Sequence, residues 1–214
     1  MLKKESVSVS HQCIYNLIHA DASGELARHT RHKLKYRRRP KNKRFPIAER
    51  TSIHSRPEQA DGKRFGDFEM DLIVDSHNHA ILTIVERSTN MLFMTKLAHG
   101  KKSEPLAKAI RHLLLPYKKH IKTTTTDNGP EFAAHKLITK YLGAVVYFAD
   151  PYALWQKGAI ENTNKLIRQY IPKQANFDDF PDKKIASIQK KINSRPRQKL
   201  RFETPKAELF KRIA

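Results

Sequence analysis

The sequence predicts an α/β fold in which a mixed five-stranded sheet is flanked by helices and preceded by a basic N-terminal arm. Three observations support this. First, residues 28–44 hold ten Lys and Arg and no acid, in a 214-residue chain of net charge +21. Second, residues 66–99 contain three apolar segments on short polar links, typical of an antiparallel meander. Third, two later β-rich segments alternate with amphipathic helices, typical of strands connected through helices.

The predicted elements follow the order β-β-β-α-β-α-β-α. Strands are expected at 66–75, 79–88 and 91–99, where apolar residues alternate or run together. A helix is expected at 103–119, with Ser103 as its cap. The remaining elements are a strand at 121–126, a helix at 130–143 ending at Gly143, a strand at 144–150 and a helix within 156–171. This is the order of a ribonuclease-H-like core, in which the first and fourth strands lie side by side.

Residues 1–60 differ in composition, with 14 Lys and Arg against 5 Asp and Glu. Residues 8–21 predict a short helix with Ser10 as N-cap, the possible end of a helix-turn-helix unit. The like charges of residues 28–44 repel one another, and this pattern predicts a disordered or extended arm that binds phosphates. The alternative, a solvated helix face, is disfavoured by Pro40. The expected phosphate contacts are Arg37, Arg38, Arg39, Lys41, Lys43 and Arg44. We therefore divide the chain into residues 1–60 and a core of residues 61–214.

The composition narrows the class of partner. So large a basic excess favours a polyanion, with nucleic acid as the default. No apolar run approaches the ~20 residues of a spanning helix, so no membrane partner is expected. The single Cys13 excludes an internal disulfide and a cysteine-rich zinc site, and fits a reduced cytoplasmic setting. An RNA-binding or ribosomal protein would explain the charge, but not the carboxylates described next.

Three carboxylates occupy related places in this order. Asp71 lies within the first strand, Asp127 ends the fourth, and Glu161 lies near the start of the last helix. Converging carboxylates repel one another unless cations hold them. Hard oxygen ligands without His or Cys suit Mg²⁺ or Mn²⁺. Two such ions, ~3.5–4 Å apart, support both the attacking and the leaving oxygen of a phosphodiester displacement.

From about residue 66 to 206 the chain resembles the IS-thirty family of bacterial DDE transposases, which are insertion-sequence enzymes with an integrase-type catalytic core. The resemblance is carried by GDFEMDLI, IVERST, TDNGPEFAAH, YFADPYALWQKGAIENTNKLIRQYIPK and NSRPRQKL, and 33 residues separate Asp127 from Glu161, as is usual there. It implies that Asp71, Asp127 and Glu161 are the metal-binding catalytic triad, with two Mg²⁺ or Mn²⁺ ions on DNA. It also implies strand cleavage and transfer at terminal inverted repeats and target DNA, by a homo-oligomer associated with the bacterial nucleoid.

Several further residues are candidates. Asp67, Glu69 and Asp71 share one strand face; the family pattern selects Asp71, and Glu69 is a possible supporting carboxylate. Asn128 is expected to shape the turn after the strand. Trp155, which precedes Gln156 in a loop, is either a core anchor or a platform for base stacking.

Lys165 and Arg168 lie at i+4 and i+7 from Glu161, on one helix face. They either neutralise Glu161 or bind DNA phosphates. In related DDE enzymes a basic residue seven positions after the glutamate often binds substrate ends, and Arg168 occupies that place.

The resemblance also implies a difference. A full-length family member carries a longer N-terminal region with helix-turn-helix modules, and SVSHQCIYNLI looks like the end of that region. We therefore expect an N-terminally truncated enzyme: residues 1–60 are a remnant of the DNA-binding region plus linker, and residues 61–214 are the catalytic core with a C-terminal helical segment. The alternative is a truncated, non-catalytic DNA-binding regulator. A retroviral-type integrase is disfavoured by the missing His-His-Cys-Cys zinc module.

Overall fold

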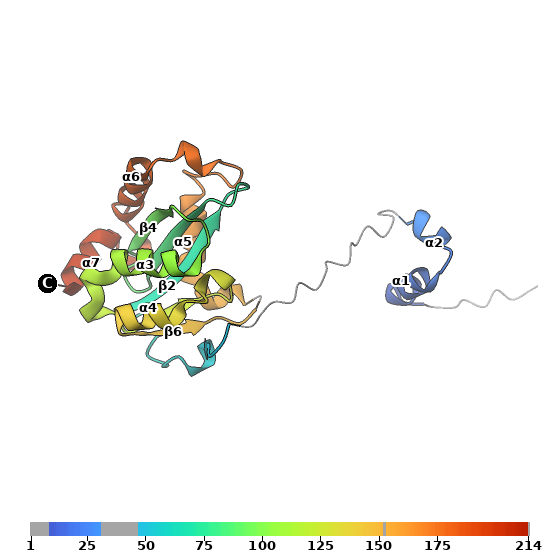
Figure 1. The fold of residues 1–214 in the computed structure, drawn as a ribbon, viewed down its shortest axis with the longest axis horizontal. Coiled ribbons are helices and arrows are strands. Elements are labelled where there is room, and N and C mark those ends of the chain that lie inside the picture. Colours follow the sequence, from blue (N-terminus) through green and yellow to red (C-terminus); the bar gives the residue numbers. More distant parts are fainter. Residues whose placement is uncertain (1–8, 31–46, 152, 214) are drawn as a thin grey trace, which may run out of the picture. The chain divides into compact units, whose positions relative to one another are not determined.

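The computed structural model describes residues 9–30, 47–151 and 153–213 (Figure 1). The chain divides into two compact units, Met1–Phe45 and Pro46–Ala214. Residues 47–60, which we had grouped with the arm, thus fall in the second unit. The basic-arm candidates Arg37, Arg38, Arg39, Lys41, Lys43 and Arg44 lie outside the described residues.

The first unit contains helices α1 (His11–Ala20) and α2 (Glu25–Arg28). Ser10 caps α1 as expected, because its hydroxyl accepts a hydrogen bond from the Cys13 N–H at 3.2 Å. No described residue of either helix is buried. Ile14 and Leu17, two apolar residues of α1, are exposed within this unit.

The second unit is built on one mixed sheet in the strand order β1-β6-β5-β2-β3-β4. The meander β2-β3-β4 is antiparallel, and β2, β5, β6 and β1 run parallel, so the expected pairing of the first and fourth predicted strands is confirmed. The strands are β1 (Thr51–Ser52), β2 (Asp67–Val74), β3 (Ala80–Glu86), β4 (Leu92–Leu97), β5 (Thr123–Thr126) and β6 (Val145–Phe148). The expected number of five was wrong, because β1 adds a sixth edge strand. Its two residues are too short to leave a periodic pattern.

Five helices of this unit cover the sheet: α3 (Ser103–Leu114), α4 (His135–Leu142), α5 (Gly158–Ile167), α6 (Asp182–Asn193) and α7 (Pro205–Ile213). Gly143 ends α4 in the left-handed region, with φ 72°, as expected. Lys102, rather than Ser103, is the N-cap of α3. Residues 115–119 and 130–132, expected to be α-helical, lie in 3₁₀ turns instead (Leu115–His120 and Pro130–Phe132), each with a proline as its first or second residue.

The core has two parts, one on each face of the sheet. One part packs side chains of α3, α4 and α7 against Phe68 and Met70 of β2. The other packs α5 and α6 against Ile73 of β2 and its neighbours. Because strand side chains alternate between faces, the odd-numbered residues of β2 point towards α5. This alternation places Asp67, Glu69 and Asp71 on the α5 face.

Candidate active site

The acidic residues of β2 form a column in which each carboxylate meets a cation. Asp67 pairs with Arg64, Nη2 to Oδ1 at 2.7 Å, and Glu69 pairs with Arg87, Nε to Oε1 at 2.8 Å. Both carboxylates are buried. Neither carboxylate is accessible to a ligand, so Asp67 and Glu69 stabilise the fold and do not bind substrate or metal. Asp71, the last of the three, keeps 21% of its side chain exposed.

Asp71 and Asp127 converge on one buried ammonium group. Glu69 is paired in register with Thr125, so Asp71 comes level with Asp127 at the end of β5. The Lys157 Nζ lies 3.4 Å from Asp71 Oδ1 and 3.7 Å from Asp127 Oδ2. The Lys157 side chain is only 6% exposed, against 44% for Asp127. The two carboxylates thus share one cation where β5 ends beside β2, and Asp127 is the more solvent-exposed of the two.

Hydrogen bonds orient both carboxylates. The Asn164 Nδ2 donates to Asp71 Oδ2 at 2.8 Å, and the Gly129 N–H donates to Asp127 Oδ1 at 3.1 Å. Burial raises the pKa of Asp71, the Lys157 ammonium lowers it, and the charge of Asp127 raises it again, with a net upward shift. This pKa pattern is the one expected where two carboxylates compete for one cation.

Helix α5 is held on β2 near its N-terminus. The Ile160 N–H, one of the unpaired donors of the first turn, donates to Glu69 Oε2 at 2.8 Å. Burial raises the pKa of Glu69, while the Ile160 hydrogen bond and the charge of Arg87 lower it, leaving it raised. Glu69 therefore joins β2, Arg87 and α5, and its contacts fix the position of the helix that carries Glu161.

Glu161 does not complete a three-carboxylate cluster here. Across residues 9–30, 47–151 and 153–213, no three His, Cys, Asp or Glu side chains lie close enough to hold a metal ion. Glu161 is nevertheless four residues after Lys157 and three before Asn164, both of which contact Asp71. It therefore lies on their side of α5. The structure brings Asp71 and Asp127 together, and their hard oxygen donors fit Mg²⁺ or Mn²⁺.

A fourth carboxylate, Glu131, was missed in the sequence. It lies in the 3₁₀ turn after Asp127. Burial raises the pKa of Glu131, its own backbone N–H lowers it, and the charge of Asp127 raises it, with a net upward shift. A Cβ at Gly129 would lie 2.5 Å from the Glu131 carboxyl carbon, so the glycine lets this side chain fold back on the turn.

Lys157 was also missed, and Asn164 was expected only to hydrogen-bond the backbone or cap the helix. Sequence reasoning followed the face of α5 forwards from Glu161, to Lys165 and Arg168, and not one turn backwards to Lys157. In the structure Lys165 is exposed. The Arg168 guanidinium, at the C-terminal cap of α5, donates to the Pro172 carbonyl at 3.3 Å.

Three other candidates occupy the loops beside the pair. Asn128 hydrogen-bonds Arg50 and the Ala149 carbonyl, which ties the turn after β5 to the end of β6. Gln156 Oε1 accepts from the Asp150 N–H at 2.7 Å and closes its loop. Trp155 is 79% exposed and therefore does not anchor the core.

Known proteins similar to this chain are transposases. The transposase for insertion sequence element IS4351 of Bacteroides fragilis is 44% identical over 212 residues, covering 96% of this chain and 64% of that protein. The transposase for IS1086 of Cupriavidus metallidurans is 34% identical, covering 93% and 61%. Transposase InsI for IS30A of Escherichia coli is 34% identical, covering 86% and 48%. The chain thus spans between 48% and 64% of the length of these curated relatives. No protein-family model matches it.

Among solved structures, the catalytic core domain of BIV integrase is similar to this chain, with a TM-score of 0.55 and 18% identity. The match covers 69% of this chain and 95% of that domain. At this identity the likeness establishes the fold alone, and it confirms the expected ribonuclease-H-like architecture.

Proposed function

The chain belongs to the IS-thirty (IS30) family of insertion-sequence transposases, and we propose that it cleaves DNA strands at the ends of an insertion sequence and joins them to target DNA. The observation that carries this proposal is the convergence of Asp71 and Asp127 on one cation position. They meet where β5 ends beside the middle of β2, and ligands collect at the carboxyl ends of parallel strands in α/β sheets. The relatives are named transposases.

Asp71 and Asp127 are the residues that would hold Mg²⁺ or Mn²⁺. When bound, such ions activate a water or 3′-hydroxyl nucleophile and stabilise the leaving oxygen. The chain itself positions these two carboxylates and helix α5. Asn164 and the Gly129 N–H fix the carboxylate planes, and Glu69 fixes the start of α5. No covalent protein intermediate is needed, because positioning and charge neutralisation carry phosphoryl-type transfer.

We assign the third carboxylate to Glu161. It lies between Lys157 and Asn164 on the flank of α5 that faces Asp71. Because Glu69 anchors α5 on β2, we propose that Glu161 reaches the pair by a change of its side chain and not of the helix. Glu131 is the competing candidate, since it lies four residues after Asp127, in the 3₁₀ turn that follows β5.

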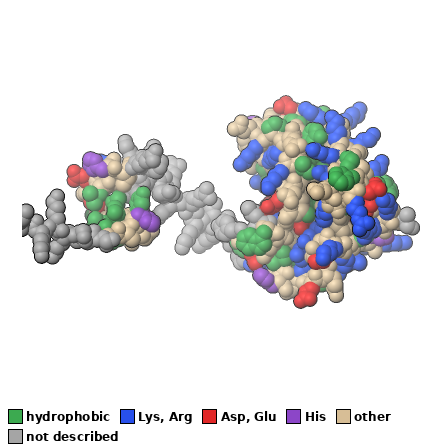
Figure 2. All heavy atoms as spheres, turned by 180° about the vertical axis from the view of Figure 1, so that it is seen from behind, with side chains coloured by type: hydrophobic (Ala, Val, Ile, Leu, Met, Phe, Trp, Pro, Cys, Tyr) green, Lys and Arg blue, Asp and Glu red, His purple; other side chains and the backbone are tan. Residues whose placement is uncertain are grey.

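DNA is the expected partner. Lys and Arg side chains are spread over the visible face of the second unit (Figure 2), in keeping with a net charge of +21. We propose that Lys165, Arg168 and the basic arm contact phosphates, and that inverted repeats and target DNA are bound by a homo-oligomer. None of the described helices is long and apolar enough to span a membrane. Action in the bacterial cytoplasm stays a prediction.

A cleavage assay on DNA that carries the element's terminal repeats tests the proposal. With Mg²⁺ or Mn²⁺ the protein is expected to nick a labelled strand and leave a 3′-hydroxyl, and with EDTA it is expected to bind without nicking. The alternative, a non-catalytic regulator, predicts binding without cleavage under both conditions. It is disfavoured because the relatives are named transposases and because both aspartates of the pair are present, with 21% and 44% of their side chains exposed.

A further inference from the structure

A cavity of about 620 Å³ lies along α5. Ala159, Asn162 and Leu166 of α5 line it, whereas Asn164 leaves the helix on the other flank to reach Asp71. The remaining walls come from three segments distant in sequence, around residues 61–63, 87–90 and 197–199. This α5-flank cleft is therefore separate from the acidic pair, with the helix between them.

The cleft carries excess positive charge. Its lining includes Lys63, Arg87, Arg197 and Lys199 against the single acid Asp61. Arg87 is already neutralised by Glu69, and Lys63 lies 3.7 Å from Asp61. Two of the four cationic side chains thus have an acidic partner, Asp61 in the wall and Glu69 outside it.

Arg197 and Lys199 are held in a different way. The Arg197 Nη2 donates to the Ile192 carbonyl at 3.2 Å, and the Lys199 Nζ donates to the Arg87 carbonyl at 2.8 Å. The Arg197 Nε is buried and, within the described chain, has no hydrogen-bond partner. Burial lowers the pKa of both groups. Neutral carbonyls hold these side chains in place without cancelling their charges, so an anion entering the cleft would be stabilised.

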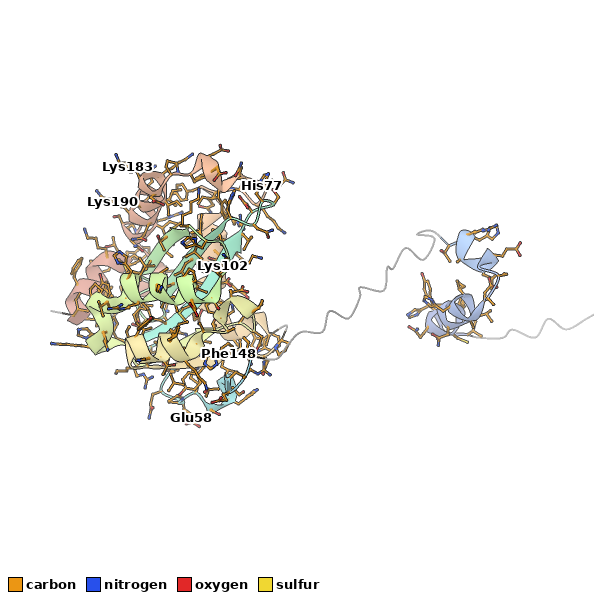
Figure 3. All side chains as sticks on the ribbon, in the orientation of Figure 1. Glu58, His77, Lys102, Phe148, Lys183 and Lys190 are labelled. Carbon is orange, nitrogen blue, oxygen red and sulfur yellow. The ribbon has the colours of Figure 1, made fainter. Side chains whose placement is uncertain are left out.

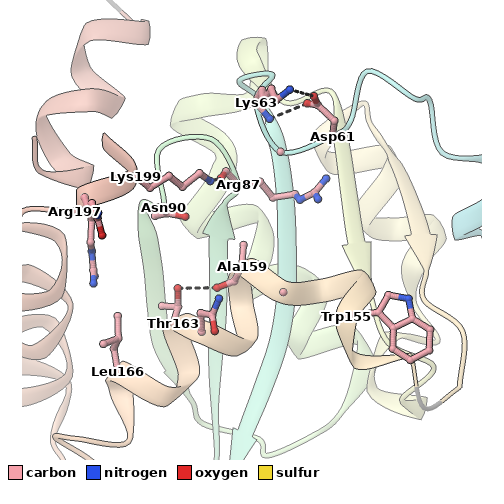
Figure 4. Close-up of a pocket in the computed structure, with 14 residues that line it drawn as sticks. Asp61, Lys63, Arg87, Asn90, Trp155, Ala159, Thr163, Leu166, Arg197 and Lys199 are labelled. Carbon is pink, nitrogen blue, oxygen red and sulfur yellow. Dashed lines mark hydrogen bonds and ion pairs between the residues drawn. The ribbon is translucent and has the colours of Figure 1, made fainter. Parts of the chain in front are cut away.

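Trp155 provides a second and independent feature. It is the single tryptophan of the chain and is 79% exposed, although its indole ring is large and apolar. Figure 4 shows it at one end of the cleft, with Arg197 at the other and Ala159 and Thr163 of α5 between them. A groove that carries both an exposed aromatic ring and cations is the combination that binds single-stranded nucleic acid, through base stacking and phosphate contacts.

We propose that the α5-flank cleft binds an unpaired nucleotide of the DNA strand, with its base on Trp155 and its phosphates towards Arg197 and Lys199. The proposal rests on the proposed function, because it takes DNA as the substrate. The volume lies within the range of sites for small organic ligands. An acidic peptide would use the cations and leave the indole ring unused. The bases of an intact duplex are already stacked on one another.

Trp155 also supplies the assay. The 214-residue chain in EDTA is titrated with a single-stranded oligonucleotide, and the fluorescence of its one tryptophan is followed. We expect saturable quenching. Trp155→Ala is expected to weaken binding of labelled single strand by about 5- to 150-fold, as loss of one stacked base does, whereas Trp155→Phe keeps most of the affinity. An exposed side chain can be removed without disturbing the core.

The cationic end of the cleft is tested by the double variant Arg197→Ala/Lys199→Ala. Its matched control is Lys183→Ala/Lys190→Ala, which removes the same charge from exposed positions of α6 (Figure 3). For single-stranded DNA, log affinity falls linearly with log salt concentration. Because two phosphate contacts are lost, the cleft variant is expected to lower the steepness of that line by about 1.4, and the control by less than half of that.

Three results overturn the inference: single-stranded DNA leaves the Trp155 emission unchanged, both cleft variants bind like their controls, or a blunt duplex quenches as strongly as single strand. Each is measured without divalent metal and without cleavage. Quenching without metal-dependent nicking would refute the proposed function and support nucleotide binding in the cleft. Metal-dependent nicking without quenching would support the proposed function and refute nucleotide binding in the cleft.

Discussion

Lys157→Met is expected to tighten the binding of Mn²⁺ to the protein. In the structure the Lys157 ammonium contacts one oxygen of Asp71 and one of Asp127, at 3.4 and 3.7 Å. A divalent ion held by the same carboxylates would need oxygens at roughly 2.1 Å, and the ammonium must withdraw to make room. Methionine keeps the length of the side chain and removes the charge.

The size of the effect follows from those distances. At an effective dielectric constant of about 20, each contact contributes roughly 5 kcal/mol before desolvation. Desolvation of the buried ammonium and solvent screening at Asp127, which is 44% exposed, offset most of this. A net displacement cost of about 1–3 kcal/mol remains, which corresponds to roughly 5- to 150-fold in the Mn²⁺ Kd.

Calorimetric titration with Mn²⁺ measures that Kd, and thermal unfolding gives a second readout. Without metal, Lys157→Met is expected to lose about 1–3 kcal/mol of unfolding free energy, because two carboxylates lose their cation. Mn²⁺ at a hundredfold excess over Kd is expected to restore about 2.7 kcal/mol. Lys165→Met, an exposed residue two turns further along α5, is the matched control. If Lys157→Met binds Mn²⁺ more weakly than wild type, Lys157 supports the site and does not compete for it.

Three further predictions test neighbouring parts of the account. Glu161→Gln is expected to abolish cleavage and Glu131→Gln to retain most of it; the reverse order of cleavage rates would make Glu131 the third ligand. Burial would raise the pKa of Asp75, but hydrogen bonds and His79 lower it to about 2, so its contribution of about 2 kcal/mol is fully present above pH ~3.8 and lost as the pH falls towards 2. Acid unfolding of Asp75→Asn is expected to lack that pH dependence, and an unchanged profile would refute the assignment. Deletion of residues 28–44 is expected to flatten the salt slope for duplex DNA by about 5 if six phosphates are contacted; an unchanged slope would make this stretch a linker.

The convergence of Asp71 and Asp127 was predictable because strand order alone decides it. Once the first and fourth predicted strands pair in parallel, their acidic residues meet at one edge. Strand order does not show which of the three β2 carboxylates is accessible. Asp67 and Glu69 share the face of Asp71, and only their burial and their ion pairs with Arg64 and Arg87 reveal that no ligand reaches them.

Tertiary contacts account for what the sequence left out. Lys157 and Asn164 reach Asp71 only because Glu69 fixes the start of α5 against β2, and no local pattern carries that information. Likewise β1 is two residues long, and β6 provides its pairing partner. The exposure of Trp155 could not be read from a loop rich in apolar residues.

The most direct test of the central claim compares cleavage by Asp71→Asn and Asp127→Asn with cleavage by Glu58→Gln, an exposed acid elsewhere on the same unit (Figure 3). All three variants are assayed with Mg²⁺ on DNA that carries the element's ends, together with their DNA affinity. Loss of at least about a hundredfold in cleavage rate is expected for each aspartate variant, with DNA binding largely kept and Glu58→Gln unchanged. An aspartate variant that cleaves at a rate near wild type would remove that residue from the site and contradict the account.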